Sequence, residues 1–255
     1  MLEHRILLDV SVEETEALMV RGWRRFGPDY FRPQCGRCSD CIPTRIPTAT
    51  FQPSKSQRRA RLKCGELELR IGVPSVDAER LALYHAWHAS REGVRGWGEA
   101  DLDERAYSIQ FAMSHPAARE VAYYEPGTEK LVGVALCDQT PNAWSAIYFF
   151  YHPDWSRASI GTANVVFQVE IARRFSIDHV YLGYRVDDCP SLAYKAAFRP
   201  QERLVGWPDF GETPRWVTSE ALPAPARLVK DGQFEDGLAE VGLVRGGLVR
   251  GGTKT

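Results

Sequence analysis

Residues 120–183 read EVAYYEPGTEKLVGVALCDQTPNAWSAIYFFYHPDWSRASIGTANVVFQVEIARRFSIDHVYLG. Segments rich in β-branched and aromatic residues alternate here with Pro-Gly and Pro-Asn turn signals, which predicts three antiparallel strands, at 120–124, 130–137 and 143–151. Residues from about 159 to 175 have the apolar spacing of a long helix, and residues 179–183 indicate another strand. The stretch therefore predicts a mixed α+β fold in which a helix connects two strands.

Further elements are expected on both sides of this stretch. They are helices at 76–90 and 101–113, a short helix at 191–198 and a last strand near 215–217. This order of elements resembles the acyltransferase fold of the N-acetyltransferase superfamily (GNAT). The resemblance implies an acyl-transfer domain over residues 73–235. Residues 236–255 contain the pentapeptide GLVRG twice and few packing residues, so they are predicted to be a disordered tail.

Residues 1–72 are predicted to form a small α+β domain that carries a cysteine cluster. Ser11 with Glu14, and Ser54 with Gln57, have the spacing of capping boxes. Two short helices are therefore expected, one from about residue 12 to 21 and one from about residue 54 to 63. Strands are expected between and after them.

The charge of the chain is unevenly distributed. The formal net charge is −1, but residues 21–70 contain twelve Lys or Arg and four Asp or Glu, a local net charge of +8. A basic block inside a near-neutral protein indicates a polyanion partner. No apolar run approaches the roughly 20 residues of a membrane span, and the amino end lacks the pattern of a secretory signal. Six cysteines in this length favour a reducing compartment, so a cytoplasmic protein without a membrane partner is expected.

Three cysteines recur at two-residue intervals, at Cys35, Cys38 and Cys41. Thiolates with this spacing can converge on one zinc ion or on an iron–sulfur cluster, although they supply three ligands at most. The alternative is that they are small residues of a tight turn. We treat the three cysteines as a candidate metal site.

Two segments have the composition of anion sites. The helix start at Ser54 offers free N–H groups and hydroxyls, and Lys55, Arg58, Arg59 and Arg61 follow it. A solvated basic helix face is the ordinary alternative. The second segment is Arg157 to Ala163, where a glycine turn opens the long helix. The superfamily uses an Arg or Gln three residues before the glycine to hold CoA, whereas Arg157 lies four residues before Gly161.

Read together, these segments resemble the arginyl- and leucyl-tRNA–protein transferases. In the first part of the chain the matching motifs are Tyr30-Phe31-Arg32-Pro33, Cys35-Gly36-Arg37-Cys38-Ser39-Asp40-Cys41, Pro43-x-Arg45 and Phe51-x-Pro53-Ser54-Lys55-Ser56-Gln57-Arg58-Arg59. In the second part they are Ser145-Ala146-Ile147-Tyr148, Ser159-Ile160-Gly161-Thr162, Tyr181-Leu182-Gly183-Tyr184 and Tyr194-Lys195-x-x-Phe198-Arg199-Pro200. The resemblance covers roughly residues 20 to 217.

The resemblance implies transfer of an amino acid from charged tRNA to a protein amine. The short chain looks like the bacterial branch, whose members add leucine to amino-terminal Asp or Glu and so mark proteins for N-degron degradation; arginine is the alternative donor. Because aminoacyl-tRNA is already an activated ester, the chemistry requires no cofactor. The expected partners are aminoacyl-tRNA and proteins with acidic amino termini, and DNA is not expected.

The implied site residues fall into three groups. Tyr184, Tyr194 and Lys195 are the candidates for catalysis. A cationic site for the acidic acceptor is expected from Lys55, Arg58 and Arg199. Contacts to tRNA are expected from Arg59, Arg61, Arg157, Gly161 and Thr162.

Two other functions are consistent with the same residues. One is a CoA-dependent N-acyltransferase with a zinc-binding accessory domain. The other is a non-catalytic relative that binds tRNA without transferring its amino acid.

Overall fold

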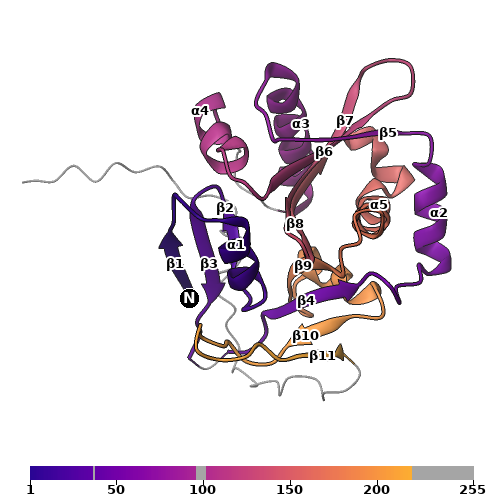
Figure 1. The fold of residues 1–255 in the computed structure, drawn as a ribbon. Coiled ribbons are helices and arrows are strands. Elements are labelled where there is room, and N and C mark those ends of the chain that lie inside the picture. Colours follow the sequence, from indigo (N-terminus) through magenta and orange to yellow (C-terminus); the bar gives the residue numbers. More distant parts are fainter. Residues whose placement is uncertain (37, 96–101, 220–255) are drawn as a thin grey trace, which may run out of the picture.

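The computed structural model describes residues 1–36, 38–95 and 102–219, which form two β-sheets with helices on both sides of the larger one (Figure 1). The larger sheet has eight strands in the order β11-β10-β4-β9-β8-β7-β6-β5. Their bounds in chain order are β4 Ile42–Pro47, β5 Glu68–Gly72, β6 Ala118–Tyr124, β7 Leu131–Gln139, β8 Ala143–Tyr151, β9 His179–Arg185, β10 Glu202–Leu204 and β11 Trp216–Thr218.

The centre of this sheet is an antiparallel meander of β6, β7 and β8, as the turn signals predict. Strand β7 is buried along nearly its whole length, because helices cover both faces of the sheet. Helix α5 (Ile160–Arg174) packs on one face together with α2 (Lys55–Lys63). Helix α3 (Ala78–Arg95) packs on β7 and β8 from the other face, followed by α4 (Glu104–Tyr107) and one π-helical turn at Ser108–Ala112.

The two strands on either side of α5 run parallel but stay paired for only three residues. The pairing of β8 with β9 ends at Ser145 and Tyr181. Beyond this point β8 continues beside β7, whereas β9 continues beside β4. The β7–β8 ladder also skips Ile147, which is a β-bulge directly after the point of divergence. The sheet therefore opens between β8 and β9.

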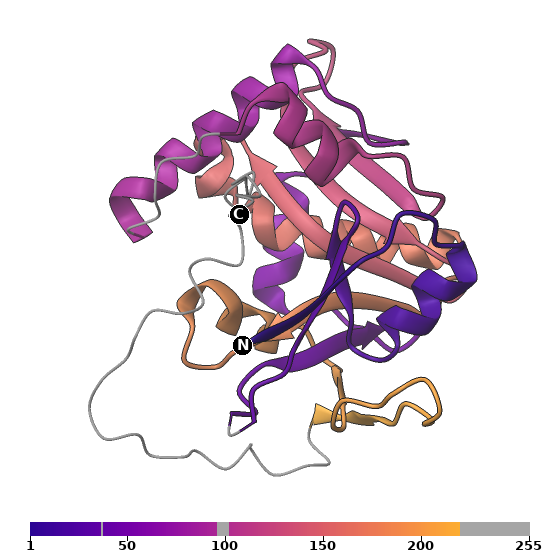
Figure 2. The ribbon, with the colours of Figure 1, turned by 90° about the vertical axis from the view of Figure 1, so that its left-hand side faces the viewer.

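A smaller unit at the amino terminus packs beside this opening. It contains β1 (Leu2–Ile6), α1 (Val12–Met19), β2 (Arg24–Phe26) and β3 (Asp29–Pro33), and the strand order of its sheet is β1-β3-β2. Ser11 and Glu14 form the capping box that the sequence predicts. Leu18, Trp23 and Tyr30 are buried in its own small core. Figure 2 looks onto this side of the molecule, with the amino-terminal unit nearest the viewer.

The structure divides the chain differently from the boundary expected at residue 72. Strands β4 and β5 and helix α2 belong to the large sheet and its covering layer, so the separate unit ends near Pro33. The mixed α/β class of the fold is confirmed. The expected tail at 236–255 lies outside the described residues. In the described ranges, no helix has the length and apolarity to cross a membrane.

The chain between β8 and the last strand forms short helical turns. These are 3-10 helices at Pro153–Ala158 (η2) and Tyr194–Ala197 (η3), and the short α6 at Pro190–Ala193. Turn η2 leads into α5 through Ser159, whose φ of +61° is left-handed. Turn η3 follows β9 and lies at the opening between β8 and β9, where it supplies a buried lysine.

Candidate active site at the opening between β8 and β9

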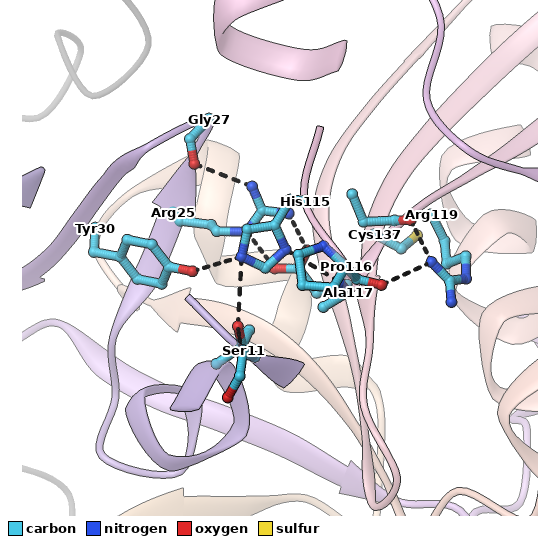
Figure 3. Close-up of polar contacts among 12 residues, drawn as sticks. Ser11, Arg25, Gly27, Tyr30, His115, Pro116, Ala117, Arg119 and Cys137 are labelled. Atoms are coloured by element: carbon cyan, nitrogen blue, oxygen red, sulfur yellow. Dashed lines mark hydrogen bonds and ion pairs between the residues drawn. The ribbon is translucent and has the colours of Figure 1, made fainter. Parts of the chain in front are cut away.

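Strand β2 is fixed to the large sheet by a buried ion pair (Figure 3). Arg25 Nε donates to Asp138 Oδ2 of β7 over 3.0 Å, and Arg25 Nη1 donates to the carbonyl of Gly27 over 3.0 Å. The side chains of Arg25 and Asp138 are 6% and 4% exposed. Because two desolvated charges must keep good geometry to be tolerated, this pair holds β2 in one position against β7.

A histidine joins the same two parts of the molecule. His115, just before β6, lies 2.9 Å from the hydroxyl of Tyr30, and its Nδ1 accepts the backbone N–H of Ala117 over 3.2 Å (Figure 3). Burial, and then the charge of Arg25, lower the pKa of His115 to about 4. The ring is therefore neutral at physiological pH, and it connects β3 to β6 without adding a charge to the interface.

The neighbouring Arg24 points to the other side of β2, toward β9, as alternation along a strand requires. Its guanidinium lies 5.2 Å from the ring centre of Tyr181. A Cβ placed on Gly183 would lie 3.7 Å from Arg24 Nε. Arg24 is buried, and within the described residues none of its three guanidinium nitrogens has a hydrogen-bond partner. Burial lowers the pKa of Arg24 from its ordinary value.

Lys195 lies on the other side of Gly183. Its Nζ would lie 3.6 Å from a Cβ on Gly183, and it donates to the carbonyl of Tyr184 over 2.8 Å. Gly183 has a φ of +79°, a conformation that favours glycine, so the position both requires glycine and leaves space between the two cations. Burial, and then the charge of Arg24, lower the pKa of Lys195 to about 7. A large fraction of this amine is therefore neutral at physiological pH.

The two tyrosines expected to act in catalysis lie in different surroundings. The hydroxyl of Tyr184 is partly buried and lies 2.7 and 3.1 Å from the carbonyl oxygens of Gly22 and Phe31, which share its one donated hydrogen. Burial raises the pKa of Tyr184. The phenol thus ties β9 to the amino-terminal unit, and it lies near enough to Arg24 to affect the pKa of that guanidinium. Tyr194 is 50% exposed and lies in η3 beside Lys195.

An aromatic cluster lines the β8 side of the site. Tyr148 of β8 stacks on Phe111 with ring centres 5.5 Å apart, and Phe26 of β2 meets Tyr148 edge-on at 6.3 Å. His88 of α3 lies 2.9 Å from the Tyr148 hydroxyl. Tyr148 and Phe26 are only partly buried, so this cluster presents apolar surface next to β2.

The expected surface cations gather on one side of α2. Its capping box is present, as the sequence predicts, and Lys55, Arg58 and Arg59 are exposed. Arg61 instead pairs with Glu170 of α5 at 3.0 Å, and its guanidinium lies 4.5 Å from the ring centre of Phe167. Arg61 therefore has a packing role in addition to any contact with a ligand.

The remaining cations lie at the two ends of α2. At its carboxyl end, Lys63 Nζ donates to the carbonyl of Arg157 over 3.5 Å, which brings α2 next to η2 and to Gly161 and Thr162 in the first turn of α5. At its amino end, the amide of Gln57 donates to the carbonyl of Ala197 over 3.1 Å. Arg199 is exposed directly after this contact. The predicted basic residues thus form one surface that extends from η2 to η3.

The cysteine loop does not gather its thiols into a metal site in this structure. Cys35 Sγ accepts a hydrogen bond from the amino group of Met1 at 2.9 Å, and the Cys38 thiol donates to Asp40 at 3.2 Å. Burial, and then the neighbouring Cys38 and Cys35, raise the pKa of Cys41 to about 11. In the described ranges, no three His, Cys, Asp or Glu side chains are placed to hold one ion. Metal binding by Cys35, Cys38 and Cys41 stays a prediction.

Arg24 is the site residue that sequence reasoning missed. The signal available was Arg24-Arg25 between Trp23 and Phe26 in a short strand. Consecutive strand residues point to opposite faces, so one of two adjacent arginines in a packed strand has to point inward. Here both are buried, Arg25 against Asp138 of β7 and Arg24 against Tyr181 of β9.

The mixed α/β fold thus places a buried lysine and a bulged strand where two parallel strands diverge, an arrangement suited to acyl transfer. Comparison with known proteins makes this more specific. The amino-terminal part of the arginine-tRNA-protein transferase family matches residues 2–59, and its carboxyl-terminal part matches residues 79–205. The chain belongs to this family and is an aminoacyltransferase.

Two curated relatives illustrate the match. The aspartate/glutamate leucyltransferase of Campylobacter jejuni is 34% identical over 206 residues, which covers 80% of this chain and 85% of the relative. The protein of the same name from Chromobacterium violaceum is 37% identical over 185 residues, covering 72% and 75%.

Solved structures give more distant similarities. The crystal structure of FemX matches with a TM-score of 0.44 and 9% identity, covering 69% of this chain and 61% of FemX. A GCN5-related N-acetyltransferase from Anabaena variabilis matches with a TM-score of 0.36 and 15% identity, covering 79% and 44%.

Proposed function

We propose that this enzyme transfers leucine from charged tRNA to the α-amine of proteins that begin with Asp or Glu, in the cytoplasm, and thereby marks them for N-degron degradation. The names of the relatives support the donor and the acceptor. The observation that carries the proposal is Lys195, a buried amine at the opening between β8 and β9 with a pKa of about 7.

The chemistry needs a proton acceptor more than a nucleophile. The α-amine of the acceptor, with an ordinary pKa near ~8, attacks the ester carbonyl carbon, so that a C–N bond forms and the bond to the ribose oxygen breaks. Neutral Lys195 accepts the proton that the amine loses and returns a proton to the departing ribose oxygen. We assign to backbone N–H groups at the bulge of Ile147 the stabilisation of the negative charge that develops on the carbonyl oxygen.

The aromatic cluster favours leucine as the donor. Phe26, Phe111 and Tyr148 offer an apolar wall to the side chain of the transferred amino acid. An arginine side chain would need a carboxylate, and the buried Asp138 nearby in the fold is already paired with Arg25.

We assign the tRNA to the basic surface between η2 and η3. Arg59, Arg157 and the first turn of α5, at Gly161 and Thr162, are the proposed contacts to its phosphates. Lys55, Arg58 and Arg199 surround the amino end of α2, close to η3, where they attract the acidic acceptor. Tyr194, 50% exposed beside Lys195, is the phenol that we assign to contact with the substrates.

A transfer assay tests the proposal directly. Purified enzyme is mixed with Leu-tRNA or Arg-tRNA and with peptides that begin with Asp, Glu or Ala. Leucine is expected on the Asp and Glu peptides, with little transfer to the Ala peptide. Arginine as the better donor would overturn the choice of leucine, transfer from neither tRNA would overturn the whole proposal, and acylation from acetyl-CoA would instead favour a CoA-dependent enzyme.

Reversal of charge at Arg59 and Arg157, two of the proposed phosphate contacts, is expected to weaken tRNA binding by about tenfold or more at low salt. Each lost phosphate contact should also reduce the slope of log Kd against log salt by about 1. Binding to labelled tRNA across a salt series measures both quantities. Lys130→Glu, an exposed reversal in the turn between β6 and β7, is the control. An unchanged slope in the double variant would exclude these residues from the tRNA surface.

A further inference from the structure

Arg24 is a buried guanidinium whose charge is poorly compensated by its surroundings. It is 8% exposed, and its Nε and both Nη atoms have no hydrogen-bond partner within the described part of the chain. The ring of Tyr181 offers it a cation–π contact, which compensates for only a small part of the desolvation of a guanidinium. A buried charge that is left without a hydrogen-bonding partner normally costs several kcal/mol.

A second cation makes the arrangement less favourable still. Lys195 is also 8% exposed and lies across Gly183 from Arg24. The buried carboxylate of the region, Asp138, has both oxygens engaged by Arg25 on the opposite side of β2. Arg24 and Lys195 are thus two adjacent basic groups in a buried place, and the nearby carboxylate of Asp138 is already bound to Arg25. Such an arrangement is expected of a site that binds an anionic ligand.

We propose that Arg24 binds the side-chain carboxylate of the acceptor's amino-terminal Asp or Glu, in the space that Gly183 leaves between Arg24 and Lys195. The inference rests on the proposed function and identifies the residue that selects acidic acceptors. A guanidinium binds a carboxylate through two parallel N–H groups, and Arg24 has such groups free. The carboxylate and α-amine of Asp or Glu are a few bonds apart, so a carboxylate on Arg24 brings the amine to Lys195.

The arrangement also connects acceptor choice to catalysis. The charge of Arg24 is one reason why the pKa of Lys195 is low. A carboxylate bound between the two groups offsets that charge and raises the pKa of Lys195. The neutral amine then appears at a higher pH with an acidic acceptor than with an amide or alanine at the same position.

The space at Gly183 is small in this structure. A Cβ on Gly183 would lie 3.6 Å from Lys195 Nζ and 3.7 Å from Arg24 Nε, so there is room for about a methyl group. A carboxylate is larger, so the long side chains of Lys195 and Arg24 have to change rotamer to admit it, while the Arg25–Asp138 pair keeps β2 in place.

The test uses the full chain with Arg24→Met, and Arg24→Lys as a second variant that keeps the charge but loses the fork. Calorimetry with peptides that differ only in an amino-terminal Asp or Asn measures binding without tRNA. We expect the enzyme to prefer Asp by about tenfold or more. The preference should disappear in Arg24→Met and be reduced in Arg24→Lys. Arg105→Met, an exposed arginine of α4, should keep it.

Thermal unfolding separates a binding role from a structural one. If Arg24 serves a ligand, its removal should leave Tm unchanged or raise it, since a buried unpaired charge is lost. A lower Tm together with an equal loss of affinity for the Asp and Asn peptides would show that Arg24 has a structural role. A loss of tRNA affinity with unchanged peptide binding would show that Arg24 binds a phosphate. Either result overturns the inference. Because the calorimetry omits tRNA, its outcome is independent of whether leucine is the donor.

Discussion

Replacement of Lys195 by methionine is expected to lower the kcat of transfer by about 100-fold or more, the range typical for loss of a general base. Methionine keeps the length and the apolar stem of the side chain, so the buried position stays filled. The variant loses the hydrogen bond to the carbonyl of Tyr184 and the group that accepts the amine's proton. Lys195→Arg keeps a donor at this position but cannot become neutral, and it should be similarly inactive.

The activity of the wild-type enzyme should rise with pH, because Lys195 must lose its proton to act as a base. An ordinary lysine has a pKa near ~10.4 and is protonated at neutral pH. Burial and Arg24 lower the pKa of Lys195 to about 7, so its neutral form appears as pH rises through 7. The kcat/KM for an acidic peptide should therefore rise through two ionisations, one near pH 7 from Lys195 and one near pH ~8 from the peptide amine. The first ionisation should be absent in Lys195→Met.

Lys130→Met is the matched control, because it makes the same substitution at an exposed lysine in the turn between β6 and β7. It should leave both the rate and the profile unchanged. A Lys195→Met enzyme that retained more than about a tenth of the wild-type kcat, with both ionisations present, would show that Lys195 is not the proton acceptor.

The local features of the fold were predictable because they depend on neighbours in sequence. The capping boxes at Ser11 and Ser54 place the starts of α1 and α2 correctly, and the turn signals separate β6, β7 and β8. The assignment of β4 and β5 to the large sheet was not predictable in the same way. Their partners are β9, β10 and β6, which are distant in the chain, and no local pattern specifies such pairings.

The candidate site, too, combines features that are visible in the local sequence with features that depend on residues distant in the chain. The motif that contains Lys195 is visible in the sequence, but its low pKa depends on burial and on Arg24, which is 171 positions away in the sequence. The family resemblance makes Tyr184 a candidate for catalysis. Its hydroxyl contacts the carbonyls of Gly22 and Phe31, and only the three-dimensional structure brings those groups to it.

Replacement of Asp138 by alanine is expected to destabilise the protein by about 3–5 kcal/mol, because it leaves Arg25 as a buried charge without its partner. The change also removes one of the main attachments of β2 to the large sheet, and β2 carries Arg24. Urea unfolding measures the free energy of unfolding, and the Asp-to-Asn peptide preference measures whether Arg24 is still held in place. Both should decrease in Asp138→Ala.

Two further variants distinguish the cost of leaving Arg25 without its partner from the net contribution of the ion pair to the free energy of unfolding. The double variant Arg25→Met with Asp138→Leu removes both charges and fills a similar volume, so it should recover most of the stability, as is common for buried ion pairs. Asp154→Ala removes a carboxylate that is 85% exposed beside His152 and should change stability by less than about 1 kcal/mol. If Asp138→Ala were no more destabilising than Asp154→Ala, the Arg25–Asp138 pair could not be what positions β2. The position of Arg24 would then have to depend on the packing of Trp23 and Tyr30 in the amino-terminal unit.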